Sequence, residues 1–251
     1  MKFVILPRSK LEKLKPLSKN SYGCLSECCS YKDGVIKSFY EEIDKATLMR
    51  IKKNLKRNSK IVIYPKKLVY KLKYEKYKLS ISPAGYYMEK APGINLTELL
   101  KKIISGNMDL SYERLLYLYY EKFLPELREE KVAIYDMKVS HIFIDDNIYL
   151  TDTDDFDDEL YVDNTDILSK LYKEPEVEYL EDNSFDRIYK YNLGEINKCF
   201  EYILYFISNY SLNIDYNLED ENYLKAVISQ IKEQTSADVK TLGQLNKYKR
   251  W

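Results

Sequence analysis

Two aspartates that flank a short strand–turn–strand pattern are the residues of this chain best suited to chemistry. Asp136 precedes the apolar run Ile142–Ile144, and Asp152 follows the apolar run Ile148–Leu150. The polar turn at 145–147 between the runs predicts a hairpin, which brings its two ends close together. Phosphoryl transfer uses such a pair of carboxylates, because one orients the attacking hydroxyl while the other holds a metal ion on the phosphates. The two carboxylates can therefore converge on one cleft, as a phosphoryl-transfer site would require.

A third candidate, Lys37, lies in a short predicted strand on the same face as Val35 and Phe39. A lysine among apolar neighbours is either an edge residue whose ammonium group reaches water or a cation directed into a cleft. The dipeptide Asp33-Gly34 precedes this strand and predicts a tight hairpin with the run Tyr22–Tyr31. These residues alone are compatible with either interpretation of Lys37.

The elements that must position these residues divide the chain into a strand-rich and a helical part. After the hairpin, the N-terminal part has a predicted helix and then two predicted strands, at Ile43–Lys56, Lys67–Leu72 and Tyr86–Glu89. The C-terminal part has predicted helices at Leu96–Ile104, Ser111–Glu130, Asp166–Tyr172, Leu193–Asn209 and Asp220–Gln234, the first with Asn95 as its cap. We expect an α+β fold with domains at 1–91 and 92–251.

Charge is unevenly distributed along a chain whose formal net charge is zero. Residues 2–78 contain 21 Lys or Arg and 7 Asp or Glu, whereas 145–166 contain 10 acidic residues and no basic one. A basic half attracts phosphates and an acidic tract attracts cations, although a solvated helix and a surface loop explain the same pattern. No nucleic-acid-binding module is recognisable. No apolar run reaches the length of about 20 residues that spans a membrane, so we predict a cytoplasmic protein.

The ordered set Lys37, Asp136, Lys138 and Asp152 resembles the protein kinase family over about 21–209. The resemblance implies a bilobal fold with a small β-rich N-terminal lobe and a larger, mainly helical C-terminal lobe. It also implies that Asp136 positions the acceptor hydroxyl with Lys138 beside it, that Lys37 contacts the phosphates of ATP, and that Asp152 binds Mg²⁺.

Further nucleotide contacts follow from the same resemblance. Gly23 would lie in the loop that covers the phosphates, and Glu89 and Ala91 would lie in the segment that receives adenine. His141 stands where the family has a second metal ligand, normally asparagine, and imidazole suits softer metals than Mg²⁺.

The sequence departs from the family pattern in the surroundings of these residues. The loop around Gly23 has a single glycine, Asp152-Thr153-Asp154 replaces Asp-Phe-Gly, and the predicted helix 43–56 has no glutamate in its central turns to pair with Lys37. Asp154 could assist a cation or be solvated.

The resemblance implies an ATP-dependent and Mg²⁺-dependent phosphotransferase of the serine/threonine protein kinase type, acting on a protein hydroxyl. The departures favour an alternative, a pseudokinase that binds a regulatory protein partner without catalysis. A third alternative, suggested by the basic N-terminal half, is a nucleic-acid-binding protein whose binding to any duplex depends strongly on salt. We expect no membrane partner, and the sequence favours the other two alternatives over nucleic-acid binding.

Overall fold

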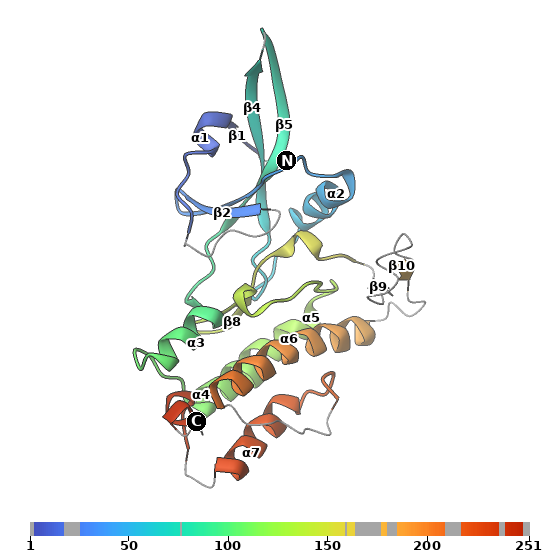
Figure 1. Ribbon diagram of the computed structural model, residues 1–251. Coiled ribbons are helices and arrows are strands. Elements are labelled where there is room, and N and C mark those ends of the chain that lie inside the picture. Colours follow the sequence, from blue (N-terminus) through green and yellow to red (C-terminus); the bar gives the residue numbers. More distant parts are fainter. Residues whose placement is uncertain are drawn as a thin grey trace, which may run out of the picture. The chain divides into compact units, whose positions relative to one another are not determined.

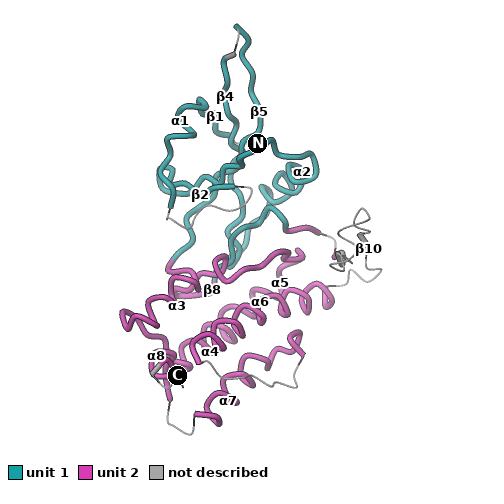
Figure 2. The backbone as a smooth tube through the Cα atoms, in the orientation of Figure 1, with its two compact units in different colours: residues 1–92, 149–155 teal, residues 93–148, 156–251 magenta. Residues whose placement is uncertain are grey.

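The computed structural model describes residues 3–17, 26–75, 77–158, 160–163, 177–179, 185–208, 217–235 and 239–247. The chain forms two compact units, shown in different colours in Figure 2. The first unit contains residues 1–92 and 149–155, and the second contains residues 93–148 and 156–251. The fold is α+β, with a five-stranded sheet in the N-terminal part and helices in the C-terminal part (Figure 1).

The first unit is built on the five-stranded sheet, whose strands lie in the order β1-β4-β5-β3-β2. The elements are β1 (Phe3–Pro7), α1 (Arg8–Leu11), β2 (Ser26–Tyr31), β3 (Gly34–Phe39), α2 (Lys45–Asn54), β4 (Pro65–Glu75) and β5 (Lys78–Glu89). β1 runs parallel to β4, and the other neighbours are antiparallel. The predicted order of strand, strand, helix, strand and strand is confirmed.

The two faces of the sheet have separate apolar cores, as the alternation along β3 predicts. Val35 packs with Leu68 and with Ile51 of α2, whereas its neighbour Ile36 packs on the opposite face with Val69. β3 lies between β5 and β2, so the alternative that Lys37 is an edge residue is wrong.

The hairpin between β2 and β3 differs from its predicted form by one residue. Tyr31 pairs with Gly34, so Lys32 and Asp33 form the turn, and Lys32 takes the left-handed conformation with φ 53°. Gly34 belongs to the strand, where a Cβ atom would lie 2.4 Å from the Met88 carbonyl oxygen. The glycine is therefore required by close packing in the sheet and not by the turn itself.

β4 and β5 are much longer than predicted and form one extended hairpin. The charged residues between the two predicted strands continue the ladder as far as the pair Glu75 and Lys78. The strand β1 was not predicted. Its parallel pairing with β4 is a long-range contact, and such contacts leave little trace in a local pattern.

The second unit is mainly helical. Its strands are β6 (Ile94–Asn95), β7 (Ile142–Ile144), β9 (Tyr161–Asp163) and β10 (Val177–Tyr179), and its helices are α3 (Leu96–Ile104), α4 (Tyr112–Tyr117), η1 (Leu118–Phe123), α5 (Leu124–Glu129), η2 (Val139–His141), α6 (Phe185–Ser208), α7 (Tyr223–Thr235) and α8 (Leu242–Lys247). The chain passes into the first unit within β8 (Ile148–Leu150) and continues there into η3 (Thr153–Asp155).

The predicted strand–turn–strand and the helix 96–104 are confirmed. β7 and β8 flank the turn at 145–147, and the Asn95 side chain accepts a hydrogen bond of 2.8 Å from the Glu98 amide at the start of α3. The predicted helix 166–172 lies outside the described residues, and the predicted later helices are observed with shifted starts, as α6 and α7.

The long helix predicted for 111–130 is confirmed as one helical stretch over 112–129, which has an irregular turn in its middle. A π-helical turn, η1, separates α4 from α5, and Pro125 stands at the second position of α5. Proline has no amide hydrogen and its ring excludes the carbonyl four residues earlier, so the regular hydrogen-bond ladder cannot continue through it. Among the helices of the described residues, none is long and apolar enough to cross a membrane.

Candidate functional site

Lys37 lies at the centre of a buried charge cluster in the first unit. Its ammonium group contacts Asp152 and also bonds both carboxylate oxygens of Asp154, at 2.8 and 2.9 Å. The side chains of Lys37 and Asp154 are only 8% and 9% exposed, whereas that of Asp152 is 28% exposed. Asp152 is therefore the member of the cluster most accessible to a ligand.

Tyr86 of β5 closes the other side of Asp154. Its hydroxyl group donates a hydrogen bond of 2.7 Å to the carboxylate, and its ring is fully buried. Tyr86 can reach this position because it neighbours Lys37 directly in the register of β3 and β5. The Asp154 carboxylate is thus held by one cation and one neutral donor, as a buried charge requires.

The electrostatics of the cluster follow from its burial. Burial alone would lower the pKa of Lys37, but the Asp154 and Asp152 carboxylates outweigh it and raise this pKa above its ordinary value. Burial raises the pKa of Asp154, and the Lys37 ammonium opposes that shift without cancelling it. Lys37 is therefore charged throughout the physiological pH range.

The acidic segment after β8 is fastened to the first unit by backbone hydrogen bonds. The Leu150 amide donates to the Ile61 carbonyl at 2.7 Å, and the Ile63 amide donates to the Leu150 carbonyl at 2.8 Å. Asp152 follows with φ 68°, a left-handed conformation that aspartate tolerates better than most residues. This turn of the backbone places Asp152 and Asp154 on the same ammonium group.

Helix α2 supplies two further contacts to this segment, from residues one turn apart. The buried Asn54 amide donates to the Thr153 carbonyl at 2.8 Å, and the Arg50 guanidinium donates to the Asp154 carbonyl at 3.1 Å and to the Asp155 carboxylate at 3.3 Å. Thus the side chains of α2 hold the acidic segment mainly by its backbone carbonyls. Helix α2 contains no acidic residue, so it provides no carboxylate to pair with Lys37.

The sequence reasoning missed most of this support. Asp154 was expected to assist a cation or be solvated, and the structure instead buries it against Lys37. Tyr86, Arg50 and Asn54 were not predicted as site residues. The spacing of Arg50 and Asn54 on one helical face was the available signal, since two polar residues in an apolar stripe need buried partners.

Asp136 and Lys138 belong to the second unit and form an ion pair with each other. Both side chains are more than half exposed, so the pair itself contributes little stability. Asp136 has φ 52°, and its neighbours Tyr135 and Met137 are buried. The loop therefore fixes its backbone in the core and presents the Asp136 carboxylate to solvent.

Asn192 of α6 anchors the chain that leads to Asp136. Its side chain is fully buried, accepts a hydrogen bond of 2.8 Å from the Ile134 amide and donates one of 2.9 Å to the Val132 carbonyl. Between these two groups, Ala133 pairs with Asp157 in an isolated antiparallel bridge, so Asn192 satisfies the backbone groups on either side of that bridge.

Replacing Asn192 with alanine is expected to lower the free energy of unfolding by about 2–3 kcal/mol, because two buried backbone groups lose their partners. Urea unfolding followed by circular dichroism measures the change. Asn222→Ala is the control, since the Asn222 side chain bonds only the exposed Asp220 carboxylate and should change stability by less than about 0.5 kcal/mol. An equally small effect of Asn192→Ala would show that the loop does not depend on α6.

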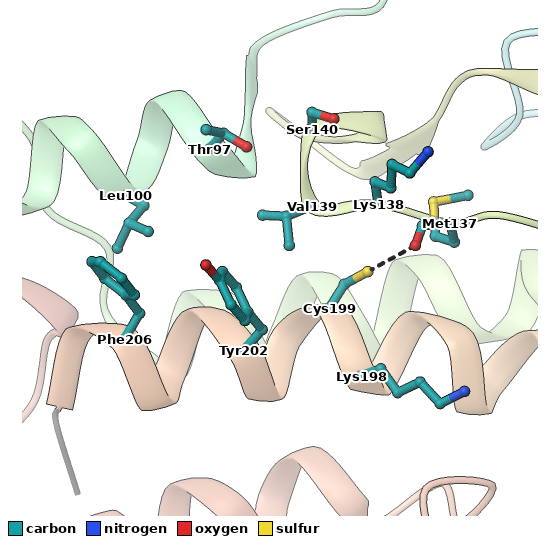
Figure 3. Close-up of a pocket in the computed structure, with 10 residues that line it drawn as sticks. All are labelled: Thr97, Leu100, Met137, Lys138, Val139, Ser140, Lys198, Cys199, Tyr202 and Phe206. Atoms are coloured by element: carbon teal, nitrogen blue, oxygen red, sulfur yellow. Dashed lines mark hydrogen bonds between the residues drawn. The ribbon is translucent and has the colours of Figure 1, made fainter. Parts of the chain in front are cut away.

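A cavity of about 500 Å³ lies beside the Asp136 loop in the second unit (Figure 3). Figure 3 shows residues of α3, of the loop 137–140 and of α6 around it, with the Cys199 thiol directed at the Met137 carbonyl, 3.7 Å away. The residues around the cavity are Thr97, Leu100, Met137, Lys138, Val139, Ser140, Lys198, Cys199, Tyr202 and Phe206. Its wall is mainly apolar, with the Lys138 side chain at one end.

The remaining predicted site residues lie in different places. Gly23 lies outside the described residues. Glu89 ends β5 with an exposed side chain, and Ala91 follows it as a buried residue. His141 ends η2 in the second unit, where its amide bonds the Lys138 carbonyl at 2.8 Å.

The donor set around Lys37 suits one hard cation. Asp152 and Asp154 offer carboxylate oxygens, and Mg²⁺ in nucleotide sites commonly takes one or two carboxylates, with phosphates and water completing its coordination. Both carboxylates contact Lys37, and Asp152 would hold the ion because its side chain is 28% exposed, whereas that of Asp154 is 9% exposed and also bonds Tyr86. Within the described ranges, no group of three or more His, Cys, Asp or Glu side chains gathers around one point.

Comparison of the chain with protein-family models and with curated proteins finds no match in either case.

Proposed function

We propose that this protein is a protein kinase-like phosphotransferase with the bilobal arrangement of that family. The observation that carries the proposal is the buried contact of Lys37 with Asp152 and Asp154, on a central strand and on the segment after β8. A lysine and an acidic pair held together in one interior can bind the phosphates and the metal ion of ATP·Mg²⁺.

In the proposed reaction, the oxygen of an acceptor hydroxyl forms a bond to the γ-phosphorus of ATP. The bond from that phosphorus to the β–γ bridging oxygen breaks, and its electron pair leaves with ADP. Asp136 accepts the hydroxyl proton, because its exposed carboxylate is free of burial and points to solvent. Lys37 offsets charge on the phosphates, and Asp152 would hold Mg²⁺, which supplies further charge neutralisation when bound.

A protein hydroxyl remains the proposed acceptor, as Lys138 next to Asp136 implies by resemblance to serine/threonine kinases. Lys138 is placed to stabilise negative charge beside Asp136, since the two side chains already form an ion pair. Adenine is proposed to bind at Glu89 and Ala91, where β5 ends.

Incorporation of radiolabel from ATP in the presence of Mg²⁺ tests the proposal, with a mixture of cellular proteins as acceptor. Asp152→Asn and Asp136→Asn are each expected to reduce incorporation at least tenfold, since the first removes a metal ligand and the second the proton acceptor. Asp186→Asn is the control, because the Asp186 side chain is exposed on α6 and pairs only with Lys190. Equal incorporation by wild type and Asp152→Asn would refute the proposed chemistry.

One observation favours the second candidate, a pseudokinase that binds a regulatory protein. Both Asp154 oxygens bond Lys37, and Tyr86 covers Asp154, so phosphates and metal must displace existing contacts before they bind. Thermal unfolding with ATP separates the candidates, because a ligand that binds the folded state alone raises the melting temperature. A shift that requires Mg²⁺ supports the enzyme, and no shift with any nucleotide supports the pseudokinase.

A further inference from the structure

The outer part of the β4–β5 hairpin has one apolar and one polar face. In its register Leu72 is opposite Ile81 and Tyr74 is opposite Leu79. The intervening pairs are polar, with Lys73 opposite Ser80. Because side chains alternate between the two faces of a strand, the apolar pairs share one face and the polar pairs share the other.

The apolar face of the hairpin is exposed, whereas the same face nearer to α2 is buried. Leu68 and Tyr86 lie under α2 with no exposed surface. Farther out, the side chains become exposed: Tyr74 69%, Leu79 57%, Ile81 54% and, next to the turn, Tyr77 95%. Figure 1 shows the hairpin extending past the rest of the first unit, with α2 near its base.

The neighbouring strand β1 enlarges this surface. Ile5 pairs with Tyr70 and is 43% exposed. Phe3 is 59% exposed, and its ring packs edge-to-face with that of Tyr70, with 6.1 Å between the ring centroids. We call Phe3, Ile5, Tyr74, Leu79 and Ile81 together with Tyr77 the hairpin surface. Contiguous apolar side chains of this kind are uncommon on a surface that faces only water.

The charge around the hairpin surface is positive. Residues 71–82 contain four lysines and one glutamate. Among the side chains that the structure describes, no carboxylate pairs with Lys71 or Lys73. These two ammonium groups, on the polar face of the ribbon, are therefore available to an anionic partner.

We propose that the hairpin surface docks onto an anionic phospholipid bilayer. If the ribbon enters tip first, both of its faces meet the bilayer. The tyrosine and aliphatic side chains of the apolar face can then enter the boundary between headgroups and acyl chains, while the lysines of the opposite face contact anionic headgroups. A bilayer also fits a protruding ribbon, since lipids rearrange around an apolar tip such as Tyr77. The proposal concerns binding to the membrane surface, so it departs from the expectation that no membrane is a partner, which was based on the lack of an apolar run in the sequence long enough to span one. It is independent of the proposed phosphotransferase activity.

Other partners fit the hairpin surface less well. A second copy of this chain would bring like charges together, because each hairpin is basic. A nucleic acid would use the lysines and stack on Tyr74 or Tyr77, but it would leave Leu79 and Ile81 without an apolar environment. An acidic protein would need a groove for the tip, and this alternative is an outcome of the test below.

Sedimentation of the full-length protein with vesicles tests the proposal. Binding is expected to vesicles of phosphatidylcholine with about 30% phosphatidylserine and to be much weaker with phosphatidylcholine alone. The double variant Lys73→Ser/Lys78→Ser should bind about 25-fold more weakly, since each lysine near an anionic bilayer contributes about fivefold. Leu79→Ser/Ile81→Ser should bind at least tenfold more weakly while salt dependence persists.

Matched variants outside the hairpin separate docking from general charge or folding effects. Lys101→Ser on α3 and Met108→Ser, 42% exposed, should bind like wild type, and circular dichroism should show that all variants are folded. Absence of sedimentation by wild type, or equal sedimentation by the hairpin variants, would overturn the proposal. Binding to polyglutamate without binding to vesicles would also overturn it and indicate an acidic protein partner.

Discussion

Lys37→Met is expected to lower the free energy of unfolding by about 3–5 kcal/mol, because it leaves buried negative charge without its cation. Asp154 is 9% exposed and would retain only the Tyr86 hydroxyl as a described donor from the cluster. Methionine keeps the length and apolar body of the lysine, so packing changes little. Urea unfolding followed by circular dichroism measures the loss. Lys66→Met is the control, since Lys66 makes only a partly exposed 4.0 Å contact with Glu89.

The loss of unfolding free energy in Lys37→Met should be larger at neutral pH than at acidic pH. Burial raises the pKa of Asp154, and removal of the Lys37 ammonium removes the effect that opposes this shift. A carboxyl group whose folded-state pKa exceeds its unfolded value of about 3.9 lowers the stability of the fold as pH rises from the unfolded pKa to the folded-state pKa. The deficit of Lys37→Met should therefore shrink when pH is lowered from about 7 to 5.

Replacing the two carboxylates that lose their cation, Asp152 and Asp154, should restore stability to Lys37→Met. The triple variant Lys37→Met/Asp152→Asn/Asp154→Asn is expected to recover at least half of the loss, and its stability should vary less with pH between about 5 and 7 than that of Lys37→Met. A Lys37→Met protein as stable as wild type, at every pH in this range, would show that Lys37 does not neutralise a buried charge.

Gly85→Ala is expected to lower the free energy of unfolding by about 3 kcal/mol, because the added methyl group has no space between two paired strands. Its Cβ atom would lie 1.9 Å from the Lys37 carbonyl oxygen and 3.1 Å from the Ser38 Cα atom. Both neighbours are backbone, so β3 must separate from β5 and carry Lys37 away from its carboxylates. Urea unfolding measures the stability, and hydrogen exchange of β3 amides locates the change.

Gly194→Ala is the matched control for this substitution. Gly194 lies inside α6, and its added Cβ atom would meet only the Glu219 Cγ atom, at an ordinary 3.5 Å. Alanine favours a helix interior over glycine, so this variant is expected to gain about 0.5–1 kcal/mol. If Gly85→Ala were as stable as wild type, β3 and β5 would be able to move apart without loss of unfolding free energy, which would contradict the prediction.

Local sequence determined most of the elements that surround the candidate site. Asn95 predicts the start of α3, and the alternation along β3 predicts that Val35 and Ile36 enter opposite cores, because capping and side-chain period are properties of a few neighbouring residues. The same local rules placed Gly34 in the hairpin turn, whereas it lies in β3. Both a tight turn and close packing between strands favour glycine, so its residue type could not distinguish them.

Only the tertiary structure decided how the charged residues are partnered. Lys37 is separated by 115 residues from Asp152 and by 117 from Asp154, and no periodicity relates positions that far apart. The period of β3 predicts the face on which Lys37 lies, but the pairing of β8 with the Ile61–Ile63 segment brings the two carboxylates to that face. The chain thus specifies its strands and helices locally, and burial of charge in one shared interior selects which of its many acidic residues neutralise Lys37.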